Sequence, residues 1–264
     1  MTADLEPTQV PPLLAPDEPA AFEVILDQQR SPFLITCDHA GKRLPRALGT
    51  LGLPESELDR HIAWDRGAAQ VARALARELG AFAILQTYSR LVIDCNRPIE
   101  VASSIPLISE RTVIPGNHDL SPALAAERAR AIFHPYHARI VSEFERRAQV
   151  AQPTVLIAVH SFTPTFMDVS RPWHTGMLYN RDVRLGRALI ELLRRDPELV
   201  VGDNEPYSVN DLSDYGVVVY GEGRGIPHVE IEIRQDLLED ASGQEAWAKR
   251  FARLLPEACA GIAL

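Results

Sequence analysis

The feature that most constrains the fold is the apolar run at 154–159 (TVLIAV), which His160 follows directly. A short continuous run of this kind is typical of a strand buried on both faces. Because such runs alternate with segments of helical spacing, the sequence predicts a three-layer αβα sandwich with a mixed, mostly parallel sheet. Further strands are expected at 33–37, 81–87, 91–94, 176–179 and 228–233.

Helices are expected where apolar residues recur at helical spacing. These segments are 62–80, 121–149 with an interruption near Pro135, 183–195 and 244–258, while 215–220 is either a helix-to-turn connection or a strand. Residues 1–20 are rich in proline and acidic residues and predict a tail. We expect a single domain over 21–264.

The composition narrows the class of protein. A net charge of −9 disfavours nucleic acid or an anionic membrane as a partner, since both repel an acidic surface. The three cysteines lie far apart without a CxxC pair, which indicates reduced thiols in a cytoplasmic protein rather than a zinc–thiolate cluster. No signal peptide and no apolar run long enough to span a membrane is expected.

Two histidines follow expected strands at the position where α/β sheets bind ligands, beyond the carboxyl ends of the strands. His39 follows 33–37 and His160 follows 154–159. A single histidine in such a place more often caps a strand, but two at equivalent ends favour a metal site. A catalytic zinc needs a third protein ligand. Asp65 and His61, which would share a helix face, are both candidates.

Strict alternation at 230–234 places Glu230, Glu232 and Arg234 on one face of a strand. This pattern fits either a solvated face or a carboxylate that serves as a general base beside a metal. Arg90 and Arg97 flank the strand expected at 91–94, where they would clamp a substrate carboxylate or form surface ion pairs. The loop residues Arg171 and Tyr207 are further candidates for substrate binding.

Six segments, in chain order, resemble the N-formylglutamate amidohydrolase family. They cover about residues 30–240 and are 37–45 (CDHAGKRLP), 61–68 (HIAWDRGA), 89–98 (SRLVIDCNRP), 159–164 (VHSFTP), 203–207 (DNEPY) and 228–236 (HVEIEIRQD).

The resemblance implies a fold similar to zinc carboxypeptidases and aspartoacylases, of the zinc-exopeptidase or phosphorylase/hydrolase-like type, with one zinc ion. It implies that His39, Asp65 and His160 hold the zinc, that Glu232 is the general base with Arg90 at the oxyanion, and that Asn96 and Arg97 bind a substrate carboxylate. Two features depart from the pattern. Lys42 stands where an HxxE motif has glutamate, and the DHAG and WDRG forms resemble a divergent branch of the family and not the histidine-degradation enzyme itself.

The expected function is therefore hydrolysis of the amide of an N-formyl or other N-acyl acidic amino acid, such as N-formylglutamate. A carboxypeptidase-like or aspartoacylase-like deacylase of another N-acyl amino acid or small peptide is the alternative enzyme. A non-catalytic module that binds carboxylates is the alternative outside enzymes. The only partner expected is a small molecule, and the sequence does not indicate the oligomeric state.

Overall fold

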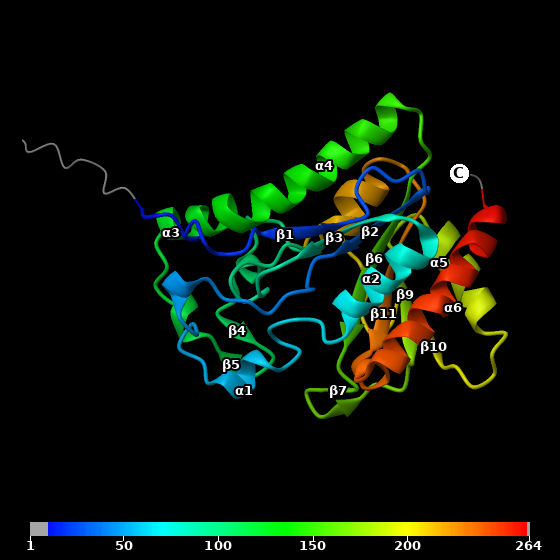
Figure 1. The fold of residues 1–264 in the computed structure, drawn as a ribbon. Helices are drawn as coiled ribbons and strands as arrows, with labels where there is room; N and C mark the ends of the chain where they lie inside the picture. The colour runs from blue at the N-terminus through cyan, green and yellow to red at the C-terminus, as the bar shows by residue number, and fades with distance from the viewer. Residues whose placement is uncertain (1–9, 263–264) are drawn as a thin grey trace, which may run out of the picture.

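The computed structural model describes residues 10–262, and within this range seven strands form one mixed sheet in the order β1-β3-β2-β6-β11-β9-β10 (Figure 1). Four of the six neighbouring pairs are parallel, whereas β1–β3 and β11–β9 are antiparallel. The expected mixed, mostly parallel sheet is confirmed. The strands are β1 (Phe22–Ile25), β2 (Phe33–Cys37), β3 (Phe82–Gln86), β6 (Val155–Phe162), β9 (Thr175–Leu178), β10 (Val201–Asp203) and β11 (His228–Arg234), and two small hairpins pair β4 (Ile108–Ser109) with β5 (Thr112–Val113) and β7 (Thr165–Phe166) with β8 (Val169–Ser170).

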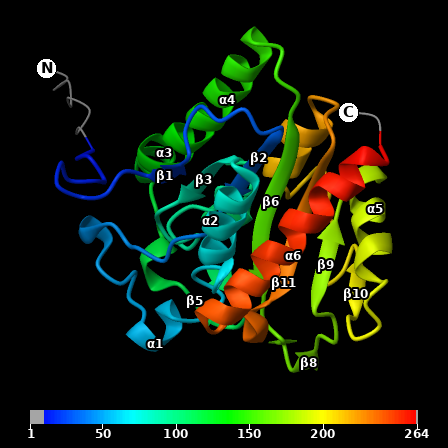
Figure 2. The same ribbon diagram turned by 45° about the vertical axis from the view of Figure 1, so that its right-hand side comes forward.

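Helices cover both faces of the sheet (Figures 1 and 2). Alternate residues of the central strands pack against α2, α5 and α6 on one face, and the others pack against α4 and long loops on the opposite face. This alternation produces the three layers. The α-helices are α1 (Glu55–Leu58), α2 (Ala68–Leu79), α3 (Pro122–Arg128), α4 (His134–Gln149), α5 (Arg184–Leu193) and α6 (Ala241–Ala260).

Three central strands, β2, β6 and β11, run parallel to one another. All eight residues of β6 are buried, and so are all five residues of β2. Because parallel strands end at the same edge, the polar residues that close β2 and β6 meet there. This edge holds the site described below.

The prediction of a strand at 91–94 is wrong. Leu91, Val92 and Ile93 are buried, but their backbone forms turns, with the Val92 amide bonded to the Ser89 carbonyl. Both edges of β3 are already paired, with β1 and β2, so the following segment finds no free edge. The buried guanidinium of Arg128 instead donates to the Val92 carbonyl at 3.0 Å.

The helix expected at 62–80 begins only at Ala68, so Asp65 lies in the turn before α2 and shares no helix face with His61. The helix expected at 121–149 is present with its interruption, a π-helical turn over Ala129–Phe133 just before Pro135. Residues 215–220 mostly fall in a second π-helical segment, Gly216–Glu222. Short strands β1 and β10 were not expected, because three or four residues carry little periodicity.

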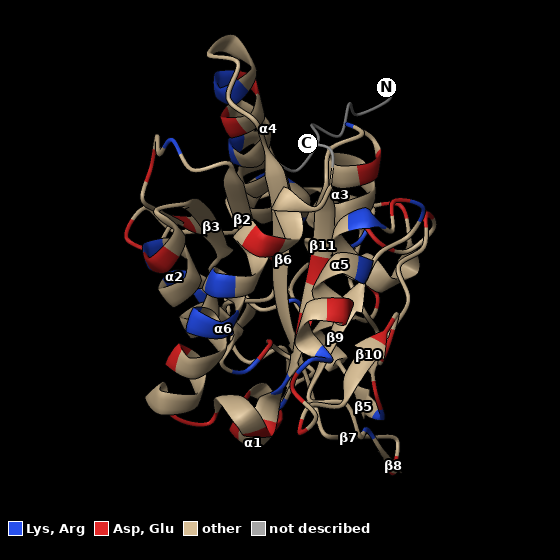
Figure 3. Cartoon of the chain, turned by 90° about the vertical axis from the view of Figure 1, so that its right-hand side faces the viewer, with Lys and Arg blue, Asp and Glu red and all other residues tan. Residues whose placement is uncertain are grey.

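Residues 10–20, assigned to the tail from sequence, contact the rest of the chain through Leu13, which is buried and donates its amide to Glu127. Residues 1–9 of that tail lie outside the described residues. Charged residues of both signs lie mainly on helices and loops (Figure 3). Across 10–262, no helix has the length and apolar character needed to cross a bilayer.

The loop after β10 rests directly on two glycines. A Cβ atom added to Gly176 would lie 1.7 Å from the carbonyl oxygen of Glu205, and one added to Gly202 would lie 2.6 Å from the same atom. The backbone of Glu205 therefore occupies the space of the missing side chains. Gly176 pairs with Glu232 across β9 and β11, so this loop lies on the same face as Glu232.

The change Gly176→Ala should therefore destabilise the protein. Its methyl group would collide with backbone, which cannot move aside like a flexible side chain, and we expect a loss of about 1–3 kcal/mol in the free energy of unfolding. Urea denaturation followed by circular dichroism measures this loss. Gly261→Ala is the control, since its Cβ would meet nothing closer than 3.6 Å. Equal stability of the two variants would contradict the close packing.

His137 on α4 is buried among aromatic rings, with Nδ1 2.8 Å from the Tyr220 hydroxyl. Burial lowers its pKa from 6.5 to about 4, so the folded protein holds the neutral imidazole. The unfolded chain then binds more protons between these values. Stability contributed by neutral His137 is present above pH 6.5 and is lost as the pH falls toward 4.

Between pH 7 and pH 4, we expect the free energy of unfolding to fall less in the His137→Gln variant than in the wild type. The difference between the two losses should reach up to about 3 kcal/mol. Urea denaturation at several pH values measures the difference. The matched change at exposed His134, His134→Gln, should follow the wild-type pH dependence. Parallel curves for wild type and His137→Gln would show that the buried imidazole does not control acid stability.

Candidate metal centre

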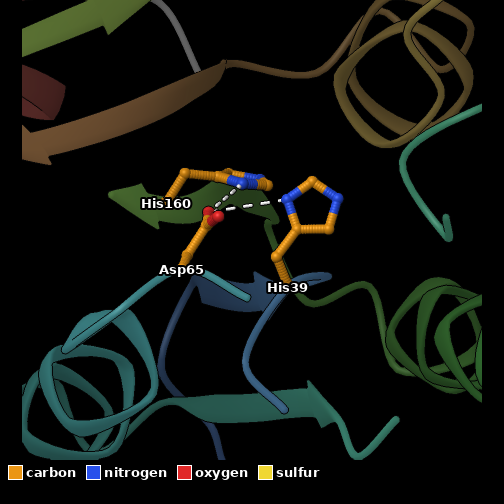
Figure 4. Close-up of side chains that lie close together, drawn as sticks. All are labelled: His39, Asp65 and His160. Atoms are coloured by element: carbon orange, nitrogen blue, oxygen red, sulfur yellow. Dashed lines mark hydrogen bonds and ion pairs between the residues drawn. The ribbon is translucent and has the colours of Figure 1, made fainter. Parts of the chain in front are cut away.

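Three buried side chains converge at the sheet edge: His39 just after β2, Asp65 before α2, and His160 on β6 (Figure 4). Oδ2 of Asp65 lies 3.0 Å from Nδ1 of His160 and 3.5 Å from Nδ1 of His39. The two imidazole rings meet edge to face, with centroids 4.9 Å apart. The structure thus brings together the three residues that the sequence named as metal ligands.

Backbone hydrogen bonds fix Asp65 in this place. Its amide donates to the His39 carbonyl at 2.9 Å, and its Oδ2 accepts from the Ser161 amide at 3.2 Å. The Ser89 hydroxyl donates to the Ala63 carbonyl of the same turn at 2.7 Å. Burial by itself would raise the pKa of Asp65, but the neighbouring His39 and His160 imidazoles hold it below its usual value.

The outer nitrogen of His39 is held by a carboxylate that the sequence did not single out. Nε2 lies 2.7 Å from Oδ1 of Asp94, which also accepts the Asn96 amide at 2.9 Å. Arg90 donates to Oδ2 of Asp94 through Nε at 3.1 Å and Nη2 at 2.7 Å. A carboxylate behind a ligating histidine fixes its tautomer and ring orientation.

His160 has two carboxylates near its outer nitrogen. Nε2 lies 3.7 Å from Oδ2 of Asp38 and 3.9 Å from Oε2 of Glu230. Tyr136 on α4 donates its hydroxyl to Oδ1 of Asp38 at 2.5 Å, which ties this carboxylate to the helix layer. Sequence reasoning missed Asp38, although its position beside His39 at a strand end was a usable signal.

The residues present fit a zinc ion. Nδ1 of His39, which faces Asp65, is buried without a hydrogen-bond partner among the described residues. One ligand atom from each of His39, Asp65 and His160 lies within 4.8 Å of the others. Two imidazoles and one carboxylate are a known donor set for a catalytic zinc, which keeps a further position open. His61, the rival third ligand, lies apart from this group, near Glu110.

Glu232 lies directly beside the metal group. In the parallel pairing of β11 with β6 it is opposite His160, and both side chains are buried on the same face. No described residue forms a hydrogen bond with its Oε2, and burial raises the pKa of Glu232 well above the usual carboxyl value. A carboxylate of raised pKa accepts a proton more readily, as a general base must. Burial also raises the pKa of Glu230, two residues earlier.

A cavity of about 630 Å³ opens onto these groups. Arg97 lines it, but its Nη1 already donates to Oδ1 of Asp214 at 2.9 Å. Asn96 also lines it, and its Oδ1 accepts the Gly216 amide at 2.9 Å. Asn96 and Arg97 therefore both line the cavity, but each already forms hydrogen bonds within the protein. The other lining residues that the argument uses are Arg90, Glu110, Phe162, Phe166, Glu205 and Tyr207.

Arg171 lies behind the cavity wall. Its Cζ is 4.6 Å from the ring centroids of both Phe166 and Tyr207, and 5.9 Å from that of Phe162. Nη1 donates to the Tyr207 hydroxyl at 2.8 Å. Arg171 thus holds the aromatic wall, while Tyr207 itself faces the cavity.

Comparison with known proteins shows the family of the chain. The family model described as N-formylglutamate amidohydrolase matches residues 31–239, most of the chain and the whole of the site. The chain belongs to the N-formylglutamate amidohydrolase family. It is 32% identical over 149 residues to an N-formylglutamate deformylase of Pseudomonas putida, which is 51% of this chain and 53% of that protein. The chain thus matches about half the length of this curated relative.

Solved structures show the same fold. The gene product Atu2144 from Agrobacterium tumefaciens has a TM-score of 0.91 and 34% identity, over 94% of this chain and 98% of that one. The N-formylglutamate amidohydrolase from Ralstonia eutropha JMP134 has a TM-score of 0.63 and 20% identity, over 90% and 97%. The second likeness supports the fold alone.

The change Asp94→Asn should weaken zinc binding by about 10–100-fold, because the amide holds the His39 imidazole less firmly than a carboxylate. Titration against a competing chromophoric chelator measures the affinity. Asp196→Asn serves as the control, since Asp196 bonds Arg250 between α5 and α6, away from the site. Unchanged zinc affinity in Asp94→Asn would show that Asp94 does not support a ligand.

Proposed function

We propose that the protein is a zinc-dependent amidohydrolase that removes a formyl or other acyl group from an N-acyl amino acid. The observation that carries this proposal is the buried group of His39, Asp65 and His160 with the unpartnered carboxylate of Glu232 beside it. Family membership supports the reaction class. N-formylglutamate is the reference substrate, because the family and the relative carry its name.

A bound zinc ion would polarise the amide carbonyl and lower the pKa of the attacking water. Glu232 takes the proton from this water as its oxygen adds to the carbonyl carbon. The carboxylic acid then passes the proton to the nitrogen while the carbon–nitrogen bond breaks. The products are a carboxylic acid, formate for a formyl substrate, and a free amine.

Arg90 is suited to stabilise the oxyanion that forms on the carbonyl oxygen. It lines the cavity, and its Nη1 lies 3.7 Å from Oδ1 of Asp65. Burial opposes its charge, but Asp94 and Asp65 raise the pKa of Arg90, so it remains a cation. Its two bonds to Asp94 hold the guanidinium in one orientation.

Arg97 is suited to hold the α-carboxylate of the substrate. Within the described residues, only Nη1 of its guanidinium is engaged, by Asp214 and by the Asn96 carbonyl, so the other nitrogens remain available. Tyr207 and Phe166 supply the aromatic wall of the cavity.

The change Glu232→Gln should lower kcat by about 10²–10⁴-fold, because the amide cannot take up the proton. Zinc content should stay at the wild-type level, whereas His160→Ala should lose both zinc and turnover. Metal analysis of purified proteins, with amine release from N-formyl amino acids as the assay, measures both effects.

Glu239→Gln is the matched control, because Glu239 is exposed and forms no ion pair within the described structure. Full turnover by metal-stripped His160→Ala protein would contradict the proposal. A wild-type protein that binds carboxylates tightly without zinc or turnover would instead be a binding module.

A further inference from the structure

The cavity has more acidic groups than basic ones. Among the described residues that line it, six are carboxylates, two are arginines and none is lysine. An N-acyl acidic amino acid brings two negative charges, one on its α-carboxylate and one on its side chain. A matching site needs a cation for each, because an unpaired charge taken out of water is costly.

Both arginines in the cavity already face carboxylates. Arg90 is bonded to Asp94 at 2.7 Å and Arg97 to Asp214 at 2.9 Å. Arg97 has free nitrogens for one substrate carboxylate, but Arg90 faces the reacting carbonyl. Arg171 is the next cation, and it lies behind the aromatic wall. Once Arg97 holds the α-carboxylate, a second substrate carboxylate finds no further cationic side chain among the described residues that line the cavity.

Three of the lining carboxylates have no arginine or lysine within 4.0 Å in the described structure: Glu205, Glu230 and Glu232. Oε2 of Glu230 lies 3.9 Å from Nε2 of His160 and 3.4 Å from Nδ2 of Asn96. Oε2 of Glu232 is buried and has no hydrogen-bond partner within residues 10–262. Glu205 is half-buried, lines the cavity and forms no ion pair with any residue of the described part of the chain. The other acidic lining residues each have a partner: Asp65 lies against the two histidines, Glu110 pairs with Arg60 and Asp214 pairs with Arg97.

Glu205 is fixed close to the reaction centre. Its carbonyl oxygen fills the space above Gly176, and Gly176 is the cross-strand partner of Glu232 on the same face of the sheet. Adjacent strands lie about 5 Å apart, so the backbone of Glu205 lies about one amino-acid side chain from the general base. A substrate whose amide meets Glu232 extends its side chain along this wall.

We propose that the substrate is an N-acyl amino acid with a basic side chain, an amine or guanidinium, and that Glu205 binds this group. This inference rests on the proposed function, since it takes the amide to lie at the metal centre. The site then rejects glutamate by charge repulsion while it keeps the family's reaction. Specificity would depend on a residue of the DNEPY segment (203–207), outside the metal centre.

The test compares kcat/KM of the zinc-loaded protein for N-formyl derivatives of glutamate, glutamine, lysine and arginine. Glutamine and glutamate have nearly the same shape, so their ratio reports charge. We expect glutamine to exceed glutamate by about tenfold or more, and lysine or arginine to exceed glutamine by a similar factor. Preference for glutamate over glutamine would overturn the proposal.

The change Glu205→Gln should lower kcat/KM for the lysine and arginine derivatives by about tenfold and leave kcat/KM for the glutamine derivative unchanged. The change Glu205→Lys should raise kcat/KM for the glutamate derivative. Glu239→Gln is again the control. Equal loss for all four substrates would indicate a general structural role for Glu205 and would overturn the proposal.

Binding separates this inference from the proposed function. Calorimetry with the same four compounds on zinc-loaded Glu232→Gln protein gives dissociation constants without turnover. Tightest binding of the lysine or arginine derivative, with no hydrolysis by the wild-type protein, would support a substrate with a basic side chain and overturn the proposed hydrolysis. Hydrolysis together with tightest binding of the glutamate derivative would support the reaction and overturn the basic side chain.

Discussion

One carboxylate, that of Asp65, joins the elements that make the site. It lies between the imidazoles of His39, after β2, and His160, on β6. The backbone amide of Asp65 also donates to the carbonyl of His39. A buried carboxylate is stable only where positive charge or hydrogen bonds compensate it. Zinc would supply this charge, and the layers of carboxylates, arginine and tyrosine around the histidines keep the ligands in place.

The sequence predicted the class of fold and the two histidines for the same reason. Buried strands of a mostly parallel sheet have a recognisable apolar pattern, and their carboxyl ends are the place for ligands. The apolar pattern gave a wrong prediction at 91–94, because a buried apolar segment need not pair as a strand. Its apolar residues are buried, but both edges of β3 are already paired with other strands. Asp65 was named through the family resemblance, but its place in a turn was not foreseen.

Contacts between segments that are distant along the chain could not be predicted from the sequence. Arg97 was expected either to clamp a substrate carboxylate or to form a surface ion pair. Nothing in its neighbourhood in the chain indicates Asp214, which reaches it from a loop more than a hundred residues later. Arg171 likewise has no local signal for its place behind Phe166 and Tyr207. Such pairings decide how many cations face a ligand, and so they determine selectivity more than the motif does.

The three residues of the metal group come from positions 39, 65 and 160, which are far apart along the chain and belong to different elements. A single ion bound to all three would act as a cross-link that closes two large loops of the polypeptide. Part of the binding free energy of the ion would then be folding free energy. Catalytic competence and resistance to proteolysis would rise and fall together in the cell as the supply of the metal changes.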